Sequence, residues 1–166
     1  MQSAVRQLNV DLATEGTAPL SIGVGLHYGR VMVGTIREPE RLDGTIISDA
    51  VNIASRLQDL TKTFGAQITL SSRMLEQLAV KGRFAHRYLG RIALKGRVEH
   101  VDVHEVLAAT EDAAQRKKRA TQSLFEAGVA AWMQDDFARA AGLFRQVYAQ
   151  HPEDKAAAYS LDRSEG

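Results

Sequence analysis

The amino-acid sequence predicts an α+β fold in which helices cover one face of a β-sheet, followed by a C-terminal α-helical hairpin. Up to residue 107, apolar segments of strand and helix periodicity follow in the order αββαβαββ. After Ala108 the composition shifts to Ala, Gln, Arg and Lys, and the rest has helical periodicity. We therefore expect two parts, residues 1–108 and residues 109–166.

In the first part, residues 1–13 predict a short amphipathic helix. Residues 20–36 predict a β-hairpin with strands at 21–27 and 31–36, followed by a polar loop at 37–44. Glycines in the first of these strands would let a helix or another backbone approach closely.

The middle of the chain predicts a helix over residues 49–64, which Gly65 ends. The elements expected after this helix are a strand at 67–70, a helix capped by Ser71 or Ser72, and strands at 84–94 and 98–107 joined by a turn at 95–97.

The composition is that of a globular protein, with 45% hydrophobic and 25% charged residues and a formal net charge of +1. This near-balance argues against a general nucleic-acid-binding protein, which needs a strongly basic surface. The chain has no cysteine, which excludes thiolate metal sites and a Cys nucleophile. No segment has the roughly 20 apolar residues of a membrane helix. We expect a cytoplasmic chain with no nucleic-acid partner and no membrane segment.

The tail has the spacing of one tetratricopeptide repeat, with Trp132 and Leu143 expected between its helices. The residues that give this spacing are Gly128, Ala140, Phe144 and Pro152. A single repeat cannot bury its hydrophobic face alone, so it would dock on the first part or bind a protein partner. An ordinary helical hairpin is the alternative. The basic run 115–119 is expected to be a solvated helix face.

Asn52 and Arg56 lie four residues apart, so they project from one face of the predicted helix, away from its apolar stripe. The Arg guanidinium offers planar donors for phosphate oxygens, and the Asn amide offers a donor and an acceptor. From the residue types alone, the two side chains are either a ligand-binding pair or a hydrogen-bonded surface pair.

Three segments resemble signature motifs of the class III adenylate and guanylate cyclase catalytic domain. Val51–Leu57 is similar to V-N-x-A-S-R-[LM], Ile22–Gly29 to I-G-[IV]-G-x-x-x-G, and Gly90–Gly96 to G-x-x-x-[VL]-K-G. The resemblance implies a partial ferredoxin-like sheet from the C-terminal half of that domain. It also implies conversion of ATP to cyclic AMP and pyrophosphate in signal transduction, by a homodimer or with a cyclase partner domain.

The resemblance also implies roles for four residues. Asn52 would orient the ribose, and Arg56 would stabilise the charge that develops at the α-phosphate. Lys95 would hold the triphosphate. Thr45 occupies the position that reads the purine, and its hydroxyl favours ATP over GTP.

The family reaction uses two divalent cations, Mg²⁺ or Mn²⁺, held by two aspartates. Their motifs resemble F-x-D-[IM]-x-[GN]-F and G-D-x-x-[ML], and neither occurs in this sequence. We therefore predict no metal ligands and no cyclase activity for the isolated chain. His100, Asp102 and His104 alternate along one predicted strand, a spacing that suits a metal site or an exposed charged strand.

Three interpretations stay open. The chain is a piece of an active adenylate cyclase, or a non-catalytic nucleotide- or protein-binding module that complements a cyclase partner. In the third, the helical tail is the functional part and binds a protein.

Overall fold

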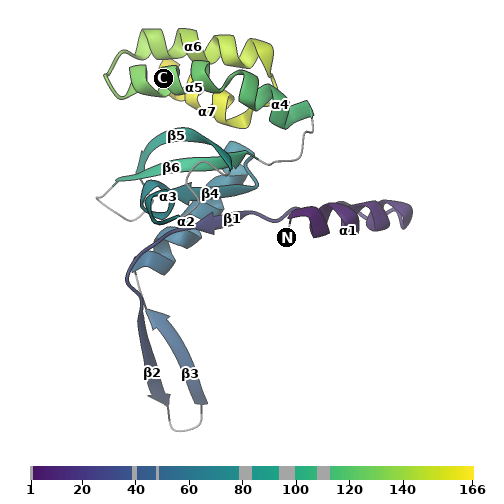
Figure 1. The fold of residues 1–166 in the computed structure, drawn as a ribbon, viewed down its shortest axis with the longest axis vertical. Helices are drawn as coiled ribbons and strands as arrows, with labels where there is room; N and C mark the ends of the chain where they lie inside the picture. The colour runs from purple at the N-terminus through teal and green to yellow at the C-terminus, as the bar shows by residue number, and fades with distance from the viewer. Residues whose placement is uncertain (1, 39–40, 48, 79–83, 94–99, 108–112) are drawn as a thin grey trace.

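The computed structural model describes residues 2–38, 41–47, 49–78, 84–93, 100–107 and 113–166 (Figure 1). The elements in chain order are α1 (Gln2–Thr14), β1 (Val24–Leu26), β2 (Met32–Glu38), β3 (Arg41–Ile47), α2 (Asp49–Phe64), β4 (Ile68–Ser71), α3 (Ser72–Gln77), β5 (Ala85–Ala93), β6 (His100–Leu107), α4 (Ala113–Ala120), α5 (Gln122–Trp132), α6 (Phe137–Gln150) and α7 (Lys155–Glu165). The predicted α+β class is confirmed, with helices after the last strand.

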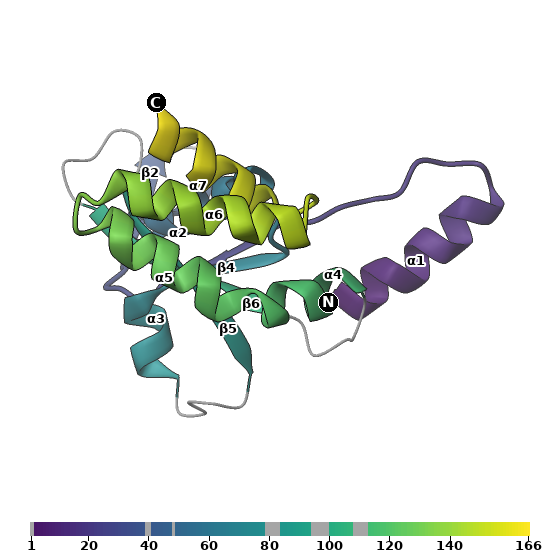
Figure 2. The same ribbon diagram turned by 90° about the horizontal axis from the view of Figure 1, so that it is seen from above.

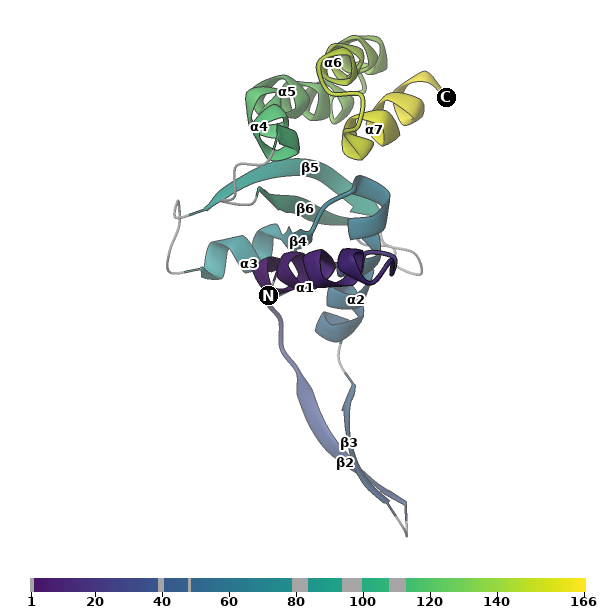
Figure 3. The ribbon, with the colours of Figure 1, turned by 90° about the vertical axis from the view of Figure 1, so that its right-hand side faces the viewer.

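The main sheet has four strands in the order β1-β4-β6-β5. Strand β1 runs parallel to β4, and the other two pairs are antiparallel. Strands β2 and β3 form a separate antiparallel ribbon that extends away from the sheet (Figures 1 and 3).

The predicted hairpin at residues 20–36 is therefore wrong. Its first strand pairs with β4, while residues 32–38 pair with β3, which includes part of the predicted loop at 37–44. A period of two shows that a segment is a strand but does not show which strand it pairs with. The turn positions 39–40 lie outside the described residues.

One face of the sheet packs against α2 and the C-terminal helices. Thr69, Glu105 and Arg87 lie opposite one another on β4, β6 and β5, so their side chains share a face. The Thr69 hydroxyl donates to the backbone oxygen of Leu57 on α2, and Glu105 binds Lys118 on α4. Helix α2 thus covers the β4 side of this face, and the C-terminal helices cover the β5 side (Figures 1 and 2).

The C-terminal helices pack on the sheet through a shared hydrophobic core. This cluster joins residues of α2, β5 and β6 to residues of α5, α6 and α7. Gly128 on α5 lies directly against Phe144 on α6, since an added Cβ would come within 2.7 Å of that ring. Trp132 and Leu143 are partly buried against the same core. The predicted C-terminal α-helical hairpin is present, and its assignment as a tetratricopeptide repeat stays a prediction.

Several predicted boundaries are confirmed. Gly65 follows α2 with a φ of 59°, the left-handed conformation expected of a C-terminal glycine. The Ser71 hydroxyl accepts from the Met74 backbone N–H at 3.2 Å and caps α3.

In the basic run 115–119, Arg116, Lys117 and Arg119 are exposed but Lys118 is buried against Glu105. None of the described helices is long and apolar enough to cross a membrane.

Candidate functional site

Helix α2 presents the two polar residues that the sequence singles out. Asn52 and Arg56 are both exposed, one turn apart. The opposite side of the helix is buried, and its buried residues are Ala50, Ile53, Leu57, Thr61 and Phe64. Arg56 lies 3.7 Å from the Asp59 carboxylate, and both side chains are about half exposed. The guanidinium is therefore held only by a weak surface ion pair and stays open to an anionic ligand.

Strand β1 fixes the position of α2 by very close packing. A Cβ on Gly25 would lie 2.2 Å from the Ala54 backbone oxygen and 2.3 Å from the Gln58 backbone nitrogen. A Cβ on Gly23 would lie 1.9 Å from the Thr61 hydroxyl. These glycines therefore act as the sequence predicts, by letting the helix backbone touch the strand. At Gly25 the backbone of the helix that carries Asn52 and Arg56 packs directly against the strand.

The other two predicted site residues are placed less fully. Thr45 belongs to β3, where it lies opposite Gly34, and β3 leads directly toward the start of α2. Lys95 and the predicted turn at 95–97 lie outside the described residues, just after β5 ends at Ala93. The structure thus brings Asn52 and Arg56 together on one face, and the roles of all four residues stay predictions.

His27 has a structural partner that sequence reasoning did not supply. Its Nδ1 lies 2.8 Å from the Ser71 hydroxyl, the same hydroxyl that caps α3. His27 follows β1 and Ser71 ends β4, so this bond ties the ends of two neighbouring parallel strands together.

The alternating residues of β6 have separate neighbours. Asp102 accepts from the Tyr88 hydroxyl at 2.6 Å, and His104 Nε2 lies 2.9 Å from the Ser72 hydroxyl. Burial, and after it the nearby His86, lower the pKa of His104 to about 4. Burial and the bond to Asp102 raise the pKa of Tyr88 above its ordinary value. A neutral His104 bound to a serine fits a structural role.

Within the described ranges, no group of three or more His, Asp or Glu side chains has the arrangement of a metal site. The donor set that Mg²⁺ or Mn²⁺ prefers, several carboxylate oxygens around one point, is not formed by these residues.

The geometry described above agrees with what a family comparison finds. Residues 1–108 match the adenylate and guanylate cyclase catalytic domain. The chain belongs to this family. This cyclase domain therefore includes β1, the β2–β3 ribbon, α2 and the β5–β6 pair, and the match ends just before the C-terminal helices.

Similar proteins include adenylate cyclases and a guanylyl cyclase. The chain is 34% identical over 113 residues to an adenylate cyclase of Anabaena cylindrica, covering 65% of this chain and 22% of that protein. It is 36% identical over 83 residues to adenylate cyclase 1 of Rhizobium meliloti, covering 50% of this chain and 12% of that protein.

Two solved structures resemble the fold. The guanylyl cyclase Cya2 has a TM-score of 0.54 and 28% identity, covering 68% of this chain and 55% of that one. The adenylyl cyclase CyaB from P. aeruginosa has a TM-score of 0.55 and 29% identity, covering 66% and 55%. The chain spans about a fifth of the Anabaena relative and about half of each solved chain.

The strongest polar feature of the structure lies outside the sequence motifs. Arg87 on β5 is fully buried and donates from Nη1 to Asp154 at 2.6 Å and from Nε to Glu105 at 2.6 Å. The Lys118 ammonium donates to the other Glu105 oxygen at 2.6 Å. We call these four residues the buried charge cluster. It joins β5 and β6 to α4 and to the start of α7.

Charge attraction within the buried charge cluster outweighs burial. Burial alone would lower the pKa of Arg87, but Glu105 and Asp154 raise it above its ordinary value. Burial alone would raise the pKa of Asp154, but the hydrogen bonds and charge of Arg87 bring it below its ordinary value. Asp154 also accepts from the backbone N–H groups of Ala156 and Ala157, so it caps α7. An aspartate shortly before an Ala-rich run was the available sequence signal for this cap.

Proposed function

We propose that this chain is a nucleotide-binding part of an adenylate cyclase that completes a catalytic site together with another cyclase domain. The observation that carries the proposal is the exposed Asn52–Arg56 pair on α2. A solvent-facing amide and guanidinium, one turn apart on a helix fixed by β1, form a rigid donor surface for a ribose and a phosphate.

In this proposal each residue of the chain has one task. Asn52 orients the ribose, and Arg56 stabilises the negative charge that develops at the α-phosphate. Lys95 binds the triphosphate, and Thr45 favours adenine over guanine. The divalent cations supply activation of the ribose hydroxyl and charge neutralisation of the phosphates. The carboxylates for them come from the other domain, so the isolated chain is inactive.

The test is complementation of a defective partner. The full chain is mixed with a cyclase domain that keeps its metal-binding aspartates but has its own Asn and Arg replaced. Cyclic AMP formation from ATP and Mg²⁺ is then measured. We expect activity in the mixture and none from either protein alone.

Single substitutions assign the activity to the site. Asn52→Ala and Arg56→Ala should each lower the rescued activity by about 10²–10³-fold. Lys62→Ala is the matched control, because Lys62 is an exposed cation on the same helix. No rescue at any mixing ratio would contradict the proposal. Rescue that survives Arg56→Ala would remove Arg56 from its role.

The non-catalytic alternative gives a different result. If the chain only binds a nucleotide, ATP binds the wild-type chain and binds the Arg56→Ala variant more weakly, while the mixture forms no cyclic AMP. The same mixtures assayed with GTP measure the preference that we assign to Thr45.

A further inference from the structure

A buried histidine lies where α6 ends and the chain turns toward α7. His151 follows α6 and is only 1% exposed, and its backbone N–H donates to the Val147 carbonyl at 2.9 Å. Its own carbonyl accepts from the Asp154 backbone N–H at 3.0 Å, which closes the turn 151–154. Both ring nitrogens are buried, and neither has a hydrogen-bond partner among the residues that the structure describes. Buried side-chain polar atoms usually have a partner, so this imidazole is an exception.

Charged side chains surround this imidazole on two parts of the chain. Lys117 and Lys118 act on it from α4. Glu153 and Asp154 act on it from the turn that His151 itself begins. Burial lowers the pKa of His151, the two acidic residues oppose this shift, and the two lysines add to it. The pKa stays below its ordinary value, so the ring is neutral at pH 7.

A proton on His151 would add a positive charge beside a buried charge cluster that is already balanced. In that cluster the two cations, Arg87 and Lys118, are paired with two anions, Glu105 and Asp154. The protonated ring would carry two N–H donors without an acceptor among the described residues, and Lys118 would repel it. A buried charge without a partner is strongly unfavourable. The ring therefore takes up a proton only when the turn opens to water.

Opening of the turn would also release α7. Asp154 ends this turn, pairs with Arg87 on β5 and caps α7 by accepting from two backbone N–H groups. Moving Asp154 into water therefore breaks both the ion pair to the sheet and the helix cap. The same four-residue turn thus contains the group that responds to acid and the group that holds α7.

We propose that the turn 151–154 is an acid-sensitive latch, which holds α7 on the cyclase domain while His151 is neutral and releases α7 when His151 is protonated. The proposal is independent of nucleotide binding at α2. It makes the packing of the C-terminal helices a property that the surrounding pH controls.

The pH range of the latch follows from the direction of the shift. Because the pKa of His151 is lowered in the folded state, its contribution to stability is complete above the ordinary value of about 6.5 and is lost as the pH falls below it. Opening takes up one proton, so its equilibrium constant rises by at most about tenfold for each pH unit. The pKa of Asp154 is lowered as well, so this carboxylate stays charged at pH 5 and above.

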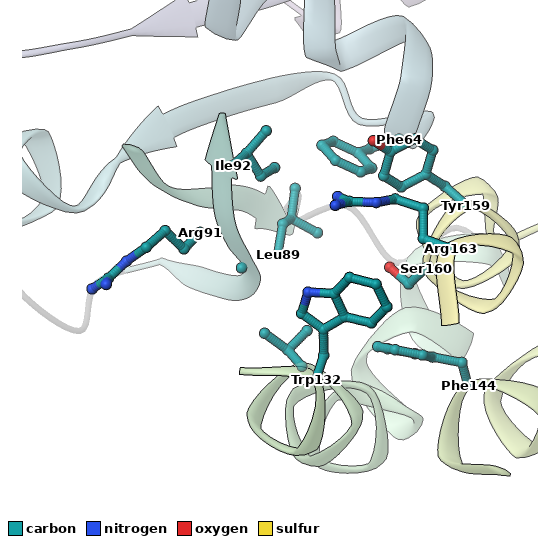
Figure 4. A pocket seen from close by; sticks show the side chains of 11 residues that line it. Phe64, Leu89, Arg91, Ile92, Trp132, Phe144, Tyr159, Ser160 and Arg163 are labelled. Carbon is teal, nitrogen blue, oxygen red and sulfur yellow. The ribbon is translucent and has the colours of Figure 1, made fainter. Parts of the chain in front are cut away.

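Release of α7 would be visible at two aromatic contacts. Tyr159 of α7 packs edge-to-face on Phe64, the last residue of α2, with ring centres 5.2 Å apart. The Arg163 guanidinium of α7 lies 5.0 Å from the centre of the Trp132 ring, and Figure 4 shows it between Trp132 and the other two rings. Trp132 is the only tryptophan in the chain, so its fluorescence reports on the position of α7.

Hydrogen exchange of the full chain, measured by mass spectrometry between pH 7.5 and 5.0, tests the latch. Rates are corrected for the intrinsic pH dependence of exchange. We expect the opening constant of α7 to rise about 5- to 30-fold over this range, while the protection of β6 stays unchanged. Acrylamide quenching of Trp132 should rise with it. No acid-dependent opening of α7, or an equal rise in β6, would overturn the proposal.

Four variants assign the response to His151. His151→Gln should remove it, because no group in the turn then titrates in this range. Lys117→Gln and Glu153→Gln change exposed side chains, so both should fold. Removing the lysine brings the pKa of His151 nearer its ordinary value, and removing the glutamate lowers it further, so the acid response should be smaller in Lys117→Gln than in Glu153→Gln. The reverse order would overturn the proposal. His104→Gln, at the other buried histidine, should leave the response of α7 unchanged, and its loss there would assign the effect to β6 instead.

Discussion

Replacing Asp154 with alanine should destabilise the whole chain, although Asp154 lies far from the candidate site. The substitution leaves the Arg87 guanidinium buried with one of its two carboxylate partners removed. It also makes the buried charge cluster net positive, since two cations then share Glu105. Breaking a buried pair from one side costs about 3–5 kcal/mol. Loss of the α7 cap adds about 1 kcal/mol.

A second substitution separates the two contributions. Asp154→Asn keeps an oxygen that can cap α7 but removes the charge. Its loss of unfolding free energy should therefore be smaller than that of Asp154→Ala only by the contribution of the cap. The double variant Arg87→Met with Asp154→Asn removes both charges and leaves Lys118 paired with Glu105. We expect the double variant to be more stable than Asp154→Asn alone, because no unpaired cation remains in the core.

Urea unfolding followed by circular dichroism measures each free energy of unfolding. Asp162→Asn, an exposed aspartate on the same helix, is the matched control and should change stability by less than about 0.5 kcal/mol. Salt should alter the Asp154 effect little, since buried charges are weakly screened. A cost below about 1 kcal/mol for Asp154→Ala, or a double variant less stable than Asp154→Asn, would refute the reasoning.

Three further predictions follow from close contacts and burial. Gly25→Ala should lower the unfolding free energy, measured by thermal unfolding, by about 3 kcal/mol or more, because the added Cβ would lie 2.2 Å from a backbone oxygen of α2. Gly142→Ala is the control and should be neutral or stabilising, because an added Cβ would meet nothing within 4 Å. The folded state holds the pKa of His104 near 4, so its contribution to stability is complete above about pH 6.5 and is lost as the pH falls toward 4, by up to roughly 3 kcal/mol. Unfolding free energies measured across this pH range should depend less on pH in the His104→Gln variant than in the wild type. The variant His100→Gln, at an exposed position, should keep the wild-type pH dependence. Arg56→Ala should change the unfolding free energy by less than about 0.5 kcal/mol, because its ion pair with Asp59 is half exposed; a larger loss would mean that Arg56 has a structural role.

The sequence predicts local features well where one segment contains the whole signal. The helix predicted from about residue 49 to residue 64 is confirmed, because its apolar stripe and Gly65 mark its buried face and its end. The exposure of Asn52 and Arg56 follows from the same stripe. The partner of β1 was not predictable in this way, since alternation specifies a strand but not its neighbour.

The features that sequence reasoning missed depend on contacts between distant residues. Arg87 and Asp154 are 67 residues apart and meet only because α7 packs on β5. Lys118 lies in a run of four basic residues that predicts a solvated helix face, yet its own side chain is buried and forms an ion pair with Glu105. The shared hydrophobic core is likewise formed by residues from separate elements, α2, β5, β6, α5, α6 and α7.

Helix α2 connects these distant features to the candidate site. Its first half carries Asn52 and is held by Gly25 of β1, while its last residue, Phe64, meets Tyr159 of α7 edge-to-face at 5.2 Å. The Arg163 guanidinium of the same helix lies 5.7 Å from the centre of the Tyr159 ring. The C-terminal helices therefore contact the same rigid helix that presents the candidate residues. Any change in how α7 packs against Phe64 therefore bears on the same helix that carries Asn52 and Arg56.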